Sequence, residues 1–212
     1  MDGQAQVVRM LRLDEVHADL TTEMLHAALR RGQAAYENTN RYHPRTYRGL
    51  VFWGESTGGL RLELGACGWT PDDTKNFSTA VDPSKRIAIA VATSDANAGR
   101  SGGDPRLKYL KGDAVQYAVL AGQGQGDFFL GYQEKEETED APQVWFFLVN
   151  RTSKAIYSEL SKPRSMTPDG QVTGWEVRAL IEPLILDTEE LGQDPEPDPT
   201  PEIDVPVTKK TK

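Results

Sequence analysis

Cysteine is nearly absent from this chain, and long hydrophobic runs are absent altogether. Its single cysteine, Cys67, excludes an internal disulfide and a cysteine-rich zinc site. The longest apolar run, residues 144–149, is far shorter than the roughly 20 residues that span a bilayer. Residues 1–5 show neither the basic nor the apolar region of a signal peptide. We therefore expect a cytoplasmic protein with no membrane partner.

Basic residues are outnumbered by acidic ones, 24 to 32, and the net charge is −8. Eight acids and three lysines lie in residues 187–212, a net of −5, which leaves −3 for residues 1–186. Acids alternate with prolines there, so this segment buries too little apolar surface to repay the entropy of ordering it. We expect one folded domain, residues 1–186, followed by a disordered, proline-rich acidic tail, residues 187–212. An acidic balance also argues against a dedicated duplex-DNA binder.

Periodicity predicts an α+β fold. A helix is expected from an N-cap at Thr21 or Thr22 to Tyr36, a second within residues 45–66 and a third near residues 113–120. Alternating apolar residues predict a hairpin at residues 76–93 and a three-stranded meander at residues 143–181. A further strand is expected at residues 128–130 and a surface loop at residues 134–140. The expected architecture is a mostly antiparallel sheet packed with two to three helices.

Two glycines in the second predicted helix, Gly54 and Gly58, lie on the same face. Each costs about 1 kcal/mol relative to alanine in a helix interior, so close approach of another backbone would explain them. The small face of the second hairpin strand, at alanines 88, 90 and 92, is the expected contact. Gly58→Leu should then overpack it.

Residues 41–48 are the stretch in which basic and aromatic side chains alternate. Residues 30–48 contain five arginines against one acid, Glu37. Arginine forks and aromatic rings suit phosphate groups and unpaired bases. The candidate partner- or nucleic-acid-binding residues are Arg41, Tyr42, His43, Arg45 and Arg48. A structural alternative is that the arginine stems cover apolar surface at a helix junction and pair with surplus acids.

Catalysis has weaker support in the sequence. A metal-dependent hydrolase would need converging carboxylates, for which Asp95, Glu159 and Glu176 are the candidates, with Lys108 or Lys111. A simpler interpretation makes Glu159 and Glu176 exposed strand residues that pair with Lys162 or Arg178. The glycine-containing loop at residues 98–104 matches neither phosphate-binding fingerprint and is expected to be an ordinary connection.

The sequence therefore favours a non-enzymatic accessory or regulatory binding protein without a cofactor. Its partner is expected to be another protein or a nucleic acid, bound through residues 41–48. The alternative is a metal-dependent, nuclease-like hydrolase that uses the clustered carboxylates.

Overall fold

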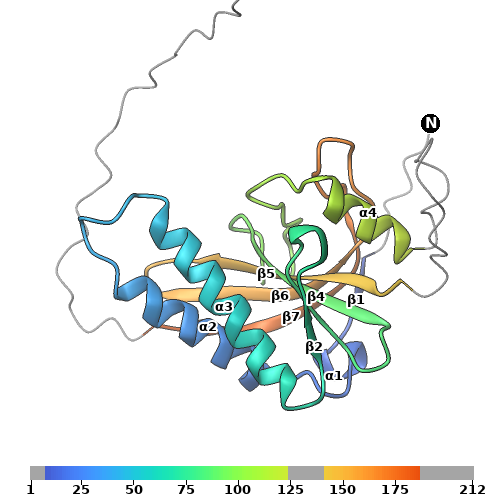
Figure 1. The fold of residues 1–212 in the computed structure, drawn as a ribbon, viewed down its shortest axis with the longest axis horizontal. Helices are drawn as coiled ribbons and strands as arrows, with labels where there is room; N and C mark the ends of the chain where they lie inside the picture. Colours follow the sequence, from blue (N-terminus) through green and yellow to red (C-terminus); the bar gives the residue numbers. More distant parts are fainter. Residues whose placement is uncertain (1–7, 124–140, 187–212) are drawn as a thin grey trace, which may run out of the picture.

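The computed structural model describes residues 8–123 and 141–186, which form one sheet with helices packed against it (Figure 1). The strands are β1 (Arg9–Met10), β2 (Thr70–Asp72), β3 (Thr79–Val81), β4 (Ile87–Thr93), β5 (Gln143–Arg151), β6 (Ala155–Pro163) and β7 (Trp175–Ile185). The helices are α1 (Leu13–Val16), α2 (Thr22–Glu37), α3 (Tyr47–Gly65) and α4 (Asp113–Ala121), with a 3-10 turn at Thr74–Asn76. The strand predicted at residues 128–130, the loop at 134–140 and the tail at 187–212 lie outside the described residues.

The α2 helix begins where local chemistry predicts. Thr21 caps α2, because its hydroxyl accepts a hydrogen bond from the backbone N–H of Met24 at 3.2 Å. Leu25, Ala28 and Leu29 of α2 are fully buried, as their helical spacing requires. Within the described ranges, no helix has the length and apolar character needed to cross a membrane.

The sheet is mixed, with the strand order β1-β7-β6-β5-β4-β3-β2. The chain is α+β, but the prediction of a mostly antiparallel sheet was wrong. The hairpin and the meander meet through a parallel pair, β4 beside β5, and β1 runs parallel to β7. The reason is the long connection between β4 and β5, which contains α4: a crossover of this kind returns the chain in the same direction, whereas a tight turn reverses it.

The two central strands, β4 and β5, are buried on both faces, so the sheet separates two hydrophobic cores. One core joins Ile89, Val91 and Phe147 to α2 and α3. The other joins alternate residues of the same strands, such as Ala90 and Phe146, to α4. Continuous apolar runs such as residues 144–149 are typical of strands covered on both sides.

The predicted contact between Gly54, Gly58 and the alanine face was wrong. A Cβ added at either glycine would meet no atom within 4 Å. The close approach is between α2 and α3 instead, where a Cβ at Gly59 would lie 2.9 Å from the Cα of Ala28. The α3 helix packs on the larger side chains of β4, and the indole of Trp53 donates to the carbonyl of Val91 at 3.1 Å.

Candidate functional site

The predicted binding residues lie in the connection between α2 and α3 and in the first turn of α3. Local hydrogen bonds shape this connection. The side-chain oxygen of Asn40 accepts from the backbone N–H of Tyr42 at 3.0 Å, and the backbone N–H of Asn40 donates to Nδ1 of His43 at 3.1 Å. Because Nδ1 of His43 is an acceptor, the proton of the neutral imidazole is on Nε2.

The aromatic rings of this connection are exposed to solvent rather than buried in the core. Tyr42 is 81% exposed, and the Arg41 guanidinium lies 5.0 Å from its ring centroid while donating to its hydroxyl at 2.9 Å. His43 stacks on Tyr47 with centroids 4.7 Å apart and ring planes 7° from parallel. Tyr47 is itself 38% exposed. Flat rings held in this way can stack on a planar ligand without first being ordered.

A further arginine reaches the same place from a distant part of the chain. Arg151 at the end of β5 lies with its guanidinium 3.6 Å from the ring centroid of Tyr36, and its Nε donates to Gln33 at 2.7 Å. Arg48 lies over the same Tyr36 ring at 5.6 Å. Figure 1 shows the α2–α3 connection beside the β5–β6 turn, at the left of the view. The turn therefore belongs to the site.

We call these residues the basic–aromatic cluster: Tyr36, Arg41, Tyr42, His43, Arg45, Tyr47, Arg48 and Arg151. All five predicted residues belong to it. Its arginines do not behave alike. Arg48 and Arg151 are half-buried against Tyr36, as the structural alternative expects, whereas Arg41 and Arg45 are exposed. The cluster thus combines positions that hold the junction together with positions that face solvent.

Three members were missed by sequence reasoning. The helical spacing of Tyr36 predicts a core residue of α2, Tyr47 lies within the basic stretch, and Arg151 is far away in the sequence. Only Tyr47 carried a local signal, since it is four residues after His43 and so follows it by about one helical turn. Nothing local predicts the contact of Arg151 with α2, because it depends on how the sheet packs.

The alternative metal-binding carboxylates do not converge. Asp95 accepts two hydrogen bonds from Asn97, at 3.0 and 3.1 Å. Glu176 is 49% exposed and pairs with Lys162 at 3.1 Å, as the simpler interpretation expected. Across the part of the chain that the structure describes, no group of three acidic, histidine or cysteine side chains is placed to hold a metal ion.

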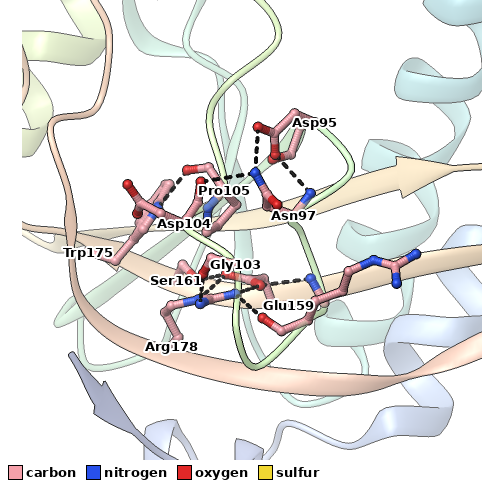
Figure 2. A network of polar contacts seen from close by, with 12 residues as sticks. Asp95, Asn97, Gly103, Asp104, Pro105, Glu159, Ser161, Trp175 and Arg178 are labelled. Carbon is pink, nitrogen blue, oxygen red and sulfur yellow. Dashed lines mark hydrogen bonds and ion pairs between the residues drawn. The ribbon is translucent and has the colours of Figure 1, made fainter.

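Glu159 does pair with Arg178, but it is completely buried and not on an exposed strand face. Arg178 donates to both carboxylate oxygens, at 2.8 and 2.5 Å (Figure 2). The same carboxylate accepts from Ser161 at 2.5 Å and from the backbone N–H of Gly99 at 2.8 Å. A charge neutralised and hydrogen-bonded in this way is structural.

The glycine-containing loop after β4 is held down by this network. Arg178 also donates to the carbonyls of Gly103 and Arg100, at 2.5 and 2.9 Å, and the indole of Trp175 donates to that of Pro105 at 2.8 Å (Figure 2). Gly99 has a positive φ of 69°, and a Cβ there would lie 2.8 Å from the backbone nitrogen of Ser158. The glycine is needed for packing on β6, and its N–H is already bound to Glu159.

No protein-family model, no curated protein and no solved structure matches this chain.

Proposed function

We propose that this protein is a non-enzymatic binding protein whose basic–aromatic cluster binds single-stranded nucleic acid. The observation that carries the proposal is the exposed ring of Tyr42 and the stacked His43–Tyr47 pair, with arginine guanidinium groups beside them. Each ring is a surface on which an unpaired base can stack, and stacking contributes about 1–3 kcal/mol per base.

The charges of the cluster support an anionic ligand. The cluster contains four arginines, and the one acid within residues 30–48, Glu37, accepts a hydrogen bond from the side chain of Gln33 at 2.5 Å. Arg45 is exposed and makes no hydrogen bond or ion pair with any other described residue. A guanidinium group offers a planar fork of donors that matches a phosphate, so Arg41 and Arg45 are the positions best suited to the nucleic-acid backbone.

A single strand suits the protein better than a duplex. Duplex binding requires an extended basic footprint along the phosphates, and the net charge of −8 offers no such surplus. A compact group of rings with a few arginines instead matches a short run of unpaired nucleotides. We infer a cytoplasmic location as part of the same proposal, because the one cysteine, Cys67, is free and exposed.

The test is a fluorescence-anisotropy titration of the full chain with a labelled 12-nucleotide single strand and with the matching duplex at low salt. Tyr42→Ala should weaken single-strand binding by about 1–3 kcal/mol, roughly 5- to 150-fold in Kd, because one stacking surface is lost. Arg41→Ala with Arg45→Ala should reduce the slope of log K against log salt by about 1.4, since each lost phosphate contact contributes about 0.7.

Tyr109→Ala is the matched control. Tyr109 is 62% exposed, and the ammonium of Lys108 lies 5.9 Å from its ring centroid, but it precedes α4 and is outside the cluster. This variant should bind like the parent chain. Absence of binding to either probe would refute the nucleic-acid proposal and leave an acidic protein partner as the ligand to test. An equal loss in the control would show that the cluster has no special role.

A further inference from the structure

The described fold ends beside the basic–aromatic cluster. Ile185 pairs with Ala155 on β6, and the backbone N–H of Leu186 donates to the carbonyl of Lys154 at 2.9 Å. Lys154 is in the same tight turn as Arg151, whose guanidinium lies over Tyr36. The chain therefore leaves the sheet at the turn that contributes an arginine to the cluster.

The segment that follows has the opposite charge. Its eight acids all lie within residues 187–204, and its three lysines come only at positions 209, 210 and 212. The first acid, Asp187, is the residue directly after Leu186. Carboxylates accept the same forked hydrogen bonds from arginine as phosphates do, so the acids of residues 187–204 are chemically suited to the arginines of the cluster.

We propose that residues 187–204 bind the basic–aromatic cluster of the same molecule and compete there with single-stranded nucleic acid. The competition rests on the proposed function, whereas the contact between tail and cluster does not. The regulated site is the exposed part of the cluster, Arg41, Tyr42 and Arg45, with Arg48 and Arg151 behind it. The tail acts as an internal substitute for the phosphate backbone.

The tether makes a weak contact effective. At no more than about 3.3–3.6 Å per residue, the 18 residues that follow Leu186 reach at most about 60 Å from it, so the cluster is within their reach. Tethering gives the tail an effective concentration of the order of millimolar at the cluster. Exposed ion pairs are individually weak and are screened by salt. The contact should therefore yield to a tighter ligand and weaken as salt rises.

The first test measures competition in the full chain. Asp194→Asn, Glu196→Gln and Asp198→Asn together remove three tail charges. The matched control, Asp104→Asn, Asp113→Asn and Asp169→Asn, removes three exposed charges near α4 and its neighbouring loops. With the labelled 12-nucleotide strand at about 25 mM salt, the tail variant should bind about 3- to 10-fold more tightly than the parent, an advantage lost at about 300 mM salt. The control should gain less than about 2-fold. Equal gains in the two variants would overturn the competition.

The second test reports the contact without nucleic acid. A nitroxide spin label is placed on Gln193→Cys in the full chain with Cys67→Ser, so every tail acid is retained. Paramagnetic broadening of the amide signals of residues 41–48 is expected at low salt and should be lost at about 0.5 M salt or in Arg41→Ala with Arg45→Ala.

Broadening absent at low salt, or unchanged by salt, would overturn the proposal. Broadening with no oligonucleotide binding would support the contact and refute the proposed function. Oligonucleotide binding without broadening would support the proposed function and refute the contact between tail and cluster.

Discussion

Replacing Arg178 with methionine should destabilise the protein more than any single change at its surface. The guanidinium is 4% exposed and donates to four acceptors: two oxygens of Glu159 and the carbonyls of Arg100 and Gly103. Arg178→Met leaves the carboxylate of Glu159 buried without its counter-charge. Removing one partner of a buried ion pair costs about 3–5 kcal/mol for this reason, so we expect a loss in that range.

The double variant Arg178→Met, Glu159→Leu distinguishes the energy of the ion pair from the energy of the other contacts that each side chain makes. It removes both charges, so no isolated charge remains, and only the hydrogen-bonding groups of Gly99, Arg100, Gly103 and Ser161 lose partners. We expect it to be more stable than Arg178→Met alone, with a coupling energy of about 2 kcal/mol or more between the two sites.

Urea denaturation of the parent, the two single variants and the double variant gives all four corners of this cycle. Amide hydrogen exchange at Gly99 reports the loop itself, because its N–H donates to Glu159, and exchange there should quicken in both Glu159→Leu variants. A loss below about 1 kcal/mol in Arg178→Met, or additive effects in the cycle, would show that this pair does not hold the loop to the sheet.

Two adjacent glycines of α3 should respond in opposite directions. Gly59→Ala should destabilise the fold by about 1–3 kcal/mol, because the added Cβ would lie 2.9 Å from the Cα of Ala28. Gly58→Ala should stabilise the fold by up to about 1 kcal/mol, because the added Cβ meets no atom within 4 Å and alanine favours the helix. Thermal unfolding of the two variants measures both effects, and equal effects would refute the α2–α3 packing. Asp73 accepts from Arg61 and Ser78, which lowers the pKa of its carboxyl to about 2. Because the pKa is lower in the folded state than in the unfolded state, the ionised carboxylate stabilises the fold above about pH 4, and this contribution is lost as the pH falls toward 2. The advantage of the parent over Asp73→Asn should therefore shrink across that pH window in urea titrations, and a constant difference would contradict the pairing.

Local signals predicted the elements of this fold well. The cap at Thr21, the helical spacing that follows it and the alternation in β7 all reflect interactions between near neighbours in sequence. The short edge strands β1 and β2 have two and three residues, too few for a periodic pattern. The parallel pairing of β4 and β5 depends on where a long crossover places its ends, which no local pattern encodes.

The errors at single residues have the same origin. Gly58 and Gly59 differ by one position, but one position rotates a side chain by about 100° around a helix, enough to exchange open space for a helix contact. Glu159 follows the alternation of an exposed residue and is buried only because the distant loop at residues 95–105 covers it. The cluster was predictable where its residues are consecutive, at 41–48, and not where Arg151 joins it across the sheet.

Photocrosslinking tests the central claim, that the basic–aromatic cluster is the binding surface, most directly. A single strand carrying 5-iodouracil is irradiated with the full chain, and the crosslinked residue is identified by mass spectrometry. We expect the crosslink on Tyr42 or on the stacked His43–Tyr47 pair, because these rings are the exposed stacking surfaces of the cluster. The crosslink should disappear at high salt. A crosslink at Tyr109, or anywhere outside the cluster, would contradict the account.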